Sequence, residues 1–545
     1  MKAITKILSL GLITACAALS SCTSQGGGAA SKGDYLLYDR ENYISEHNSL
    51  RTLGMGYAAE DYTRIYTDKG SFTEVTDVKA LVVPVDFTDF PASSLRSGSN
   101  SEELAKKDIE DAVFGEGESE RLPWESLKSY YEKSSFGECH IEGKVTDWYH
   151  TGKSVTQFAA NGTGATQTLC KAVTKWAVET QGISTKDYDA NGDGYIDSII
   201  MIYSCPPHVQ VKGKAVNDDL YWAFCYSSSD AGSNKEDPSP YRFFWASYKT
   251  FFENGPTVDG KYKDWTDEQI KSGVATIDSH TLIHEFGHVL SLPDLYNGNY
   301  DLQGKNANAY DPTCGTDMMS YNVGDHNAWS KALYGWVAPY VVYGDATITL
   351  KSTTDTGNFI ALPAVDMEEP DREFTLLSQF VMLEFLTPTG VAKYDGEHKF
   401  SGNYPLWYKE AGVRATLIDA RPGRFAYGGG FEGFTAAVGS GTGYYVNFAC
   451  NNNDVTRSCF ETYKICELIP NSDTDIRAKD LRTATDENLY HEGDRFNLSG
   501  DSVWKDFKVD SKDGYRNLIF NYGFEITEMD ETQTTIKITK VHDSI

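Results

Sequence analysis

Two histidines four residues apart, with a glutamate directly after the first, constrain this chain more than any other feature. The motif runs from His284 through Glu285 to His288. On an α-helix, positions four apart lie on one face, about 6 Å apart along the axis. Two imidazoles so placed can bind one Zn²⁺ ion, and the glutamate beside them can take a proton from zinc-bound water. The fold must therefore present this helix together with a third ligand and a coordination position open to solvent.

The residues after this helix supply a candidate third ligand. Pro293 ends the helix, and Asp294 stands six residues beyond His288. The alternatives for the third ligand are His326 and residues that neighbour Glu285 in space. Two helical ligands, a tight turn and a third ligand three residues after the turn resemble the metzincin pattern. Ser291 stands where metzincins usually have glycine, and a positive φ at a serine would cost about 1 kcal/mol or more.

A methionine-containing segment follows about 30 residues downstream of the motif. Met319 best fits the turn that metzincins place beneath the metal as a hydrophobic floor, and Met318 is the alternative. Tyr321 resembles the tyrosine that approaches the zinc in some metzincins, where a phenol could donate a hydrogen bond to the oxyanion. Together with Glu285 as general base, these residues predict hydrolysis of peptide bonds by zinc-activated water.

Residues 284–294 resemble the zinc motif of the immune inhibitor A family of metallopeptidases. Other segments that resemble this family are 324–331, 333–336, the strand at Val78, the helix with Tyr130 and Tyr131, and the loop at Asp189. The resemblance covers roughly residues 77–340. It implies a secreted zinc endopeptidase with a metzincin-like fold, protein or peptide substrates, Asp294 as the third ligand, and calcium that supports the fold.

An acidic loop places oxygen ligands at alternating positions, which suits Ca²⁺. The predicted ligands are Asp189, Asn191, Asp193, the Tyr195 carbonyl and Asp197. The bidentate glutamate of an EF-hand is absent, because Ile200 stands at position twelve. We therefore predict a loop braced by structural calcium rather than a calcium sensor, and an acidic turn without metal is the alternative.

Hydrophobic patterns predict an α+β fold: a metzincin-like domain with a mixed twisted sheet and the active-site helix, then a β-rich, sandwich-like domain. Strands are predicted at 78–87, 140–149 and 198–203, helices at 124–131 and 167–179, and C-terminal strands at 346–350, 444–448 and 534–538. Leu169, Val173 and Val178 are candidates for the buried stripe of the second helix. The catalytic domain should span 77–340 and the β-rich domain 341–545.

The N-terminus resembles a bacterial lipoprotein signal. A basic start and a short apolar stretch lead to Leu19-Ser20-Ser21-Cys22, where cleavage would precede the cysteine and its sulfur would carry lipid. An ordinary signal peptide is the alternative. We expect a signal at 1–21, a flexible tether at 22–33, and at 34–76 either a packed N-terminal segment or a pro-segment. The protein would be extracytoplasmic and lipid-anchored to a bacterial membrane, with cell-surface exposure left open.

Charge and cysteine content limit the partners. Asp and Glu outnumber Lys and Arg by 78 to 49, giving a formal charge of −29, so the surface repels phosphate backbones and nucleic acid is excluded as a partner. Eight cysteines remain after the signal region, and an even number in an exported protein permits disulfides. Cys205 with Cys225 is the first expected pair, and the second lies among Cys450, Cys459 and Cys466. The oligomeric state is not predicted.

Two rival functions share the same motif. A surface lipoprotein could capture protein or glycan through its β-rich domain, with the zinc fold as a scaffold. A scaffold has no need of Glu285, so the presence of that residue favours an enzyme. A non-proteolytic zinc hydrolase acting on glycan-linked or other amides would use the same metal chemistry, and the helix motif does not exclude it.

Overall fold

The computed structural model describes residues 35–37 and, with interruptions, 77–540. The longest interruptions are 298–310, 435–443, 452–463, 472–482 and 498–517. The predicted signal, the tether with Cys22 and most of the 34–76 segment lie outside the described residues. In the part of the chain that the structure describes, no helix combines the length and apolar character needed to cross a membrane.

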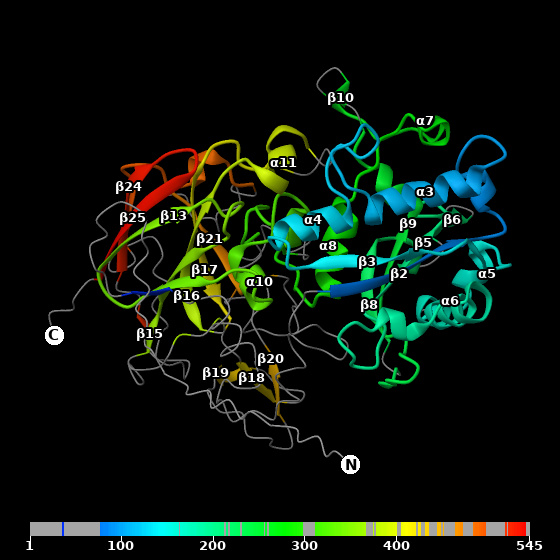
Figure 1. Cartoon of the computed structure of the whole chain (residues 1–545), viewed down its shortest axis with the longest axis horizontal. Coiled ribbons are helices and arrows are strands. Elements are labelled where there is room, and N and C mark those ends of the chain that lie inside the picture. The colour runs from blue at the N-terminus through cyan, green and yellow to red at the C-terminus, as the bar shows by residue number, and fades with distance from the viewer. Residues whose placement is uncertain are drawn as a thin grey trace, which may run out of the picture.

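A mixed β-sheet forms the centre of the N-terminal half (Figure 1). Its strands are β2 (Asp77–Asp86), β3 (His140–Val145), β4 (Tyr149–His150), β5 (Ser198–Tyr203), β8 (Phe224–Ser227) and β9 (Arg242–Ser247). The order is β3-β2-β5-β9-β8, with β4 also paired to β2. All pairs are parallel except that of β8 with β9, so an antiparallel strand ends the sheet. Every residue of β5 is buried, as expected for a parallel strand covered on both faces.

Helices cover both faces of this sheet. On one face lie α3 (Ser101–Phe114), α4 (Leu127–Ser134) and α8 (His280–Val289), and on the other lies α6 (Ala165–Gln181). Successive β2 residues alternate between the two resulting cores, as side chains of a strand must. The result is a three-layer arrangement that buries most of α8.

The predicted buried stripe of α6 is partly wrong. Leu169 and Val173 are buried, but Val178 is 40 % exposed. The stripe continues instead at Ala177, which is fully buried. Residues four apart repeat on one helix face, whereas position 178 is turned a further 100° or so towards solvent.

The C-terminal half contains two larger sheets. The first has the order β1 (Tyr35–Leu37), β12 (Pro339–Val342), β14 (Phe359–Pro363), β16 (Gln379–Leu386), β17 (Gly412–Asp419) and β21 (Cys466–Ile469). The second has the order β13 (Ala346–Lys351), β25 (Gln533–Lys540), β24 (Tyr522–Met529) and β22 (Arg495–Asn497). The two sheets share one buried apolar cluster. The described chain is thus mixed α/β with several sheets and helices, while the sandwich topology and the domain limits stay predictions.

The first of these two sheets, which contains β16 and β17, packs its other face against the N-terminal core. Met382 of β16 and Ile418 of β17 belong to the same apolar cluster as Phe286 of α8. In Figure 1, α8 and α10 (Ala328–Leu333) lie between the two bodies of strands, and α11 (Lys393–Glu397) lies above them. The helix that carries the histidine motif is therefore enclosed by both halves of the chain.

Shorter elements complete the described chain. They are α5 (Val155–Ala159), α7 (Asp267–Ser272), α9 (Met318–Tyr321), β6 (Gln210–Val211), β7 (Lys214–Ala215), β10 (Thr257–Val258), β11 (Lys261–Tyr262), β15 (Val365–Asp366), β18 (Gly423–Ala426), β19 (Phe431–Phe434), β20 (Tyr444–Asn447) and β23 (Leu518–Ile519). The predicted strands at 346–350, 444–448 and 534–538 correspond to β13, β20 and β25.

Candidate metal site

The structure brings His284, His288 and Asp294 together at the end of α8. The Nε2 atoms of the two histidines lie 3.3 and 3.1 Å from Oδ1 of Asp294, respectively. Within the described residues, these three form the one group of at least three His, Cys, Asp or Glu side chains whose ligand atoms lie within 4.8 Å of one another. His326, the alternative third ligand, is not part of it.

Backbone carbonyls orient both imidazoles. Nδ1 of His284 lies 2.8 Å from the carbonyl oxygen of Met318, and Nδ1 of His288 lies 2.8 Å from that of Leu292. A carbonyl only accepts, so each Nδ1 must carry the hydrogen. In neutral imidazoles, Nε2 then presents a lone pair towards Asp294. Hydrogen bonds of this kind fix the tautomer of metal-binding histidines.

The donor set fits a divalent cation. Two lone pairs and a carboxylate oxygen that face one another at this distance repel unless positive charge stands between them, and Oδ1 of Asp294 is buried without a hydrogen-bond partner. Without metal, protons supply that charge: burial lowers the pKa of His288, but Asp294 outweighs burial and raises it to about 9. Burial also opposes ionisation of Asp294, yet the charges of His288 and His284 hold its pKa far below the usual range. Two imidazoles and one carboxylate are a ligand set of catalytic zinc.

The turn between the helix and Asp294 has the strained backbone that the sequence predicted. Ser291 adopts a φ of +77°. Arg242, at the start of β9, compensates with three hydrogen bonds from Nη1, to the carbonyls of His288 and Val289 and to Oγ of Ser291. These bonds satisfy carbonyls at the helix end, which lack partners within the helix. The sequence reading missed Arg242, although a single charge at the start of an apolar strand is a signal of such a role.

Glu285 is buried beside the two histidines. Its residue is 9 % exposed, and burial raises the pKa of its carboxyl. The neighbouring imidazoles and a hydrogen bond from the backbone of Cys225 oppose that rise. Cys225 belongs to β8, the end strand of the sheet, so the edge of the sheet lies next to this carboxylate. A carboxyl in this position can accept a proton from water and return it to a leaving group.

The methionine segment packs beneath α8. Asp317 accepts a hydrogen bond from the backbone of Met319 at 2.8 Å and so caps α9. The sulfur of Met319 lies 2.3 Å from the place where a Cβ on Gly287 would be, so the side chain fits only because residue 287 has none. Met318 contributes its carbonyl to His284 instead. Of the two methionines considered, Met319 is thus the one whose side chain packs against Gly287 of the motif helix.

Three aromatic or imidazole side chains nearby have distinct partners. Tyr321 hydrogen-bonds Asp311, whose pKa burial raises to about 7 against the effect of that bond. The role of Tyr321 at the oxyanion stays a prediction. His326 lies beneath Gly287, with Nε2 3.2 Å from the hydroxyl of Tyr131. Tyr296, two residues after Asp294, has its ring centroid 6.2 Å from that of His284, and the sequence reading missed it.

The predicted calcium loop is held by hydrogen bonds to its own backbone. Asp189 accepts the N–H groups of Asp193 and Gly194, each at 3.0 Å. Asp197 accepts those of Ala190 at 3.2 Å and Lys79 at 2.9 Å, and burial raises its pKa to about 7. Asn191 Oδ1 shares the N–H of Asp193 with Asp189, and Asp193 Oδ1 accepts the N–H of Tyr195. Calcium binding here stays a prediction.

The expected pair of Cys205 with Cys225 is wrong, because neither forms a disulfide. Cys225 is level with Phe244 of β9, and β9 separates β8 from β5. Two strand spacings amount to about 9.6 Å, whereas a disulfide needs Cα atoms within about 7 Å. Cys466 forms none either, and Cys450 and Cys459 lie outside the described residues.

Imidazoles anchored through Nδ1, with a carboxylate from the next turn closing the set, form a candidate metal site of the kind that metallopeptidases use. Comparison with known proteins gives the family. Residues 66–321 match the family model described as "Immune inhibitor A peptidase M6, catalytic domain". The chain carries a peptidase M6 domain, and the resemblance to the immune inhibitor A family is confirmed.

Two characterised proteins are similar over 263 residues. "Immune inhibitor A" of Bacillus thuringiensis subsp. alesti is 26 % identical, and the match covers 44 % of this chain and 36 % of that protein. "Pre-pro-metalloprotease PrtV" of Vibrio cholerae serotype O1 (strain M66-2) is 22 % identical, with 42 % and 26 % covered. The chain thus spans about a third or less of the length of these relatives.

Proposed function

We propose that the chain is a zinc-dependent endopeptidase that cleaves proteins outside the cytoplasm. The observation that carries the proposal is the convergence of His284, His288 and Asp294 next to the buried carboxyl of Glu285, with both imidazoles oriented by backbone carbonyls. A scaffold without activity would not need this glutamate. The peptidase M6 match and the metalloprotease relative support the same reaction.

His284, His288 and Asp294 would hold the zinc. When bound, the ion supplies Lewis acidity for peptide hydrolysis. Glu285 acts as general base: it takes a proton from the attacking water and returns it to the leaving amine. Burial raises the pKa of its carboxyl, which helps it to hold that proton between the two steps. Tyr321 is proposed to donate to the oxyanion, which requires its hydroxyl to leave Asp311.

The edge strand offers a place for an extended substrate. β8 is the end strand of its sheet in the described chain, and the backbone of Cys225 on that strand reaches Glu285. A peptide added along such an edge gains backbone hydrogen bonds and lies beside the carboxylate. This geometry favours protein or peptide substrates over small amides.

Two further parts of the proposal rest on the sequence alone. Lipidation at Cys22 would anchor the protein to a bacterial membrane, and calcium would brace the loop from Asp189 to Asp197. Mass spectrometry of the membrane fraction tests the first, and calcium titration of the purified protein tests the second.

The main test compares the full chain with Glu285→Gln on a peptide library, with and without a zinc chelator. We expect the wild type to bind one zinc and cleave internal peptide bonds, and the variant to retain zinc and lose cleavage. Glu268→Gln, which changes an exposed glutamate on α7, is the control. Unchanged cleavage by Glu285→Gln, or a wild type that binds no zinc, would refute the proposal.

A further inference from the structure

The backbone around the candidate metal site is held by buried polar side chains from the C-terminal half of the chain. Three segments surround the site: the start of α8, the residue after Asp294, and the loop 311–328 that carries Met319 and Tyr321. Each of them receives at least one hydrogen bond from a buried side chain beyond residue 380.

Asn451 holds the backbone next to the third ligand. Its side chain is fully buried, and Nδ2 donates to the carbonyl of Leu295 at 2.8 Å and to that of Cys466 at 2.7 Å. Its Oδ1 accepts the N–H of Cys466 at 3.2 Å. Leu295 directly follows Asp294, and its own N–H donates to the carbonyl of Met319 at 2.7 Å. One amide therefore ties β21 to the turn that presents the ligand.

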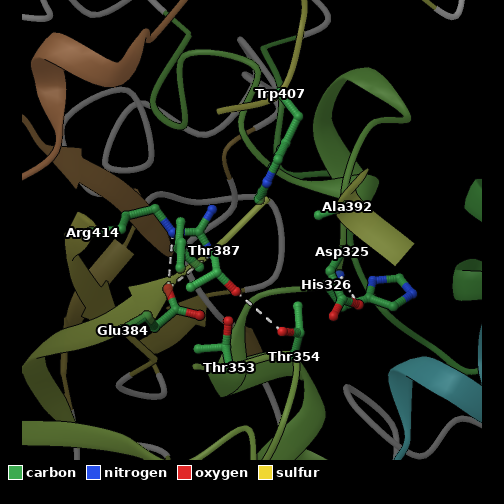
Figure 2. Close-up of a pocket in the computed structure, with 10 residues that line it drawn as sticks. Asp325, His326, Thr353, Thr354, Glu384, Thr387, Ala392, Trp407 and Arg414 are labelled. Carbon is green, nitrogen blue, oxygen red and sulfur yellow. Dashed lines mark hydrogen bonds and ion pairs between the residues drawn. The ribbon is translucent and has the colours of Figure 1, made fainter. Parts of the chain in front are cut away.

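Arg414 and Glu384 hold both ends of the methionine segment. Nε and Nη2 of Arg414 lie 2.9 and 2.8 Å from Oε2 of Glu384, and both side chains are almost fully buried. Nη1 of Arg414 donates to the carbonyl of Thr316, ahead of Met319. Oε1 of Glu384 accepts the N–H of Ala328, where α10 begins. Figure 2 shows this pair opposite Asp325 and His326.

Asp395 of α11 connects the start of the motif helix with the end of the same loop. One carboxylate oxygen lies 2.8 Å from Nε2 of His280, and the other accepts the N–H of Gly324 at 2.6 Å. The ring of Trp407 lies 2.3 Å from the place where a Cβ on Gly324 would be. The Asp395 carboxylate is fully buried. Because a buried charge is costly unless it is paired and hydrogen-bonded, its bonds to His280 and Gly324 hold it in a specific position.

We propose that the C-terminal half of the chain is part of the catalytic centre, with Asn451, Arg414, Glu384 and Asp395 as positioning residues for the metal ligands and the methionine segment. The inference rests on the proposed function. The match to the M6 catalytic domain ends at residue 321, before all four side chains. The matched region therefore depends on later residues for the placement of its ligands.

Asn451→Ala in the full chain is the first test, with Asn471→Ala as the matched control. Asn471 donates to the Leu489 carbonyl and to Asp494, away from the metal site. Loss of a residue that supports a metal ligand typically weakens metal binding about 10–100-fold. We expect a loss of this size in zinc affinity for Asn451→Ala, measured by chelator competition, a shifted Co²⁺ absorption spectrum, and no change for Asn471→Ala.

The paired variant Arg414→Met/Glu384→Gln is the second test, because it removes both partners of the ion pair and leaves neither one buried with an unpaired charge. Arg495→Met/Glu525→Gln removes an exposed ion pair from the same half and is its control. We expect the first pair to lower kcat with little change in KM and to speed hydrogen exchange of residues 311–328 in the metal-free protein. Arg414→Lys, which keeps the charge, should recover part of kcat.

The outcomes separate the two hypotheses. Suppose that the wild type binds zinc and cleaves peptides. If the folded Asn451→Ala and Arg414→Met/Glu384→Gln variants then match it in zinc affinity, Co²⁺ spectrum and kcat, the inference fails while the proposed function stands. If the wild type neither binds zinc nor cleaves, the proposed function fails and this inference fails with it.

Discussion

The sulfur of Met319 occupies the space in which a side chain on Gly287 would begin, 2.3 Å from the ideal Cβ position. Gly287 lies between Glu285 and His288 on α8, and Met319 lies on α9. Contact this close makes the glycine of the motif and the methionine mutually dependent.

Gly287→Ala should destabilise the protein by about 1–3 kcal/mol, because the added methyl overpacks a closed core. Urea unfolding of the metal-free chain measures the change. Met319→Ala introduced into Gly287→Ala should cost less than the sum of the two single changes, since the clash is removed. Gly232→Ala, where nothing lies within 4 Å, serves as the control. Additive losses in the double variant would show that the two residues do not touch.

Substitutions at Ser291 test whether the hydrogen bond from Arg242 compensates for the strained backbone of the turn. Ser291→Ala keeps the positive φ and loses the hydrogen bond from Arg242, whereas Ser291→Gly loses the bond and relieves the strain. We expect Ser291→Gly to be the more stable of the two by about 1 kcal/mol in urea unfolding. At Ser272, inside α7, the order should reverse because alanine favours a helix. The same order at both positions would contradict the turn geometry.

Local patterns in the sequence predicted the elements that local forces determine. The apolar run at 198–203 became β5, and the spacing of His284 and His288 required the helix on which they lie. The position of Asp294 beside the two histidines was predictable from the turn that follows the helix and from its distance of six residues from His288, although the helix ends at Val289, ahead of Pro293. These are contacts between residues close in the chain, which periodicity and spacing report directly.

Contacts over long sequence distances were not predictable in this way. Arg414 meets a carbonyl 98 residues away, and Asn451 meets one 156 residues away. The disulfide expected for Cys205 failed for the same reason, since nothing local shows that β9 separates the two strands. Lone charges inside apolar strands, such as Glu384 in β16, were the one visible sign that a buried partner existed.

The described cysteines, all buried except the half-buried Cys225, should behave as unreactive thiols. Burial raises the pKa of Cys170 and of Cys225 to about 12, so the reactive thiolate is scarce at neutral pH. Iodoacetamide should label neither in the native protein, and both after unfolding without reductant, as read by peptide mass spectrometry. Cys205 should follow the same pattern. Labelling of Cys205 and Cys225 that requires prior reduction would show that they form a disulfide after all.

His280 should make stability depend on pH. Its ring is fully buried, with Nδ1 2.8 Å from Asp278 and Nε2 2.8 Å from Asp395, and it stacks on Trp124. Burial lowers its pKa, but the two carboxylates outweigh burial and raise it from 6.5 to about 9. The folded state therefore holds the proton more tightly than the unfolded state. The resulting stabilisation is complete below pH 6.5 and is lost as pH rises through 9.

A raise of this size corresponds to roughly 3 kcal/mol. His280→Gln should remove the effect, so the difference in unfolding free energy between wild type and variant should shrink by about that amount from pH 6 to pH 10. Urea unfolding of the metal-free proteins measures it. Titrating groups away from His280 cancel in the difference, whereas Asp395, whose pKa burial raises and His280 lowers, also contributes to it. His140→Gln, which changes an exposed histidine on β3, should run parallel to the wild type. Should His280→Gln also run parallel, the ring does not carry its charge between the two aspartates.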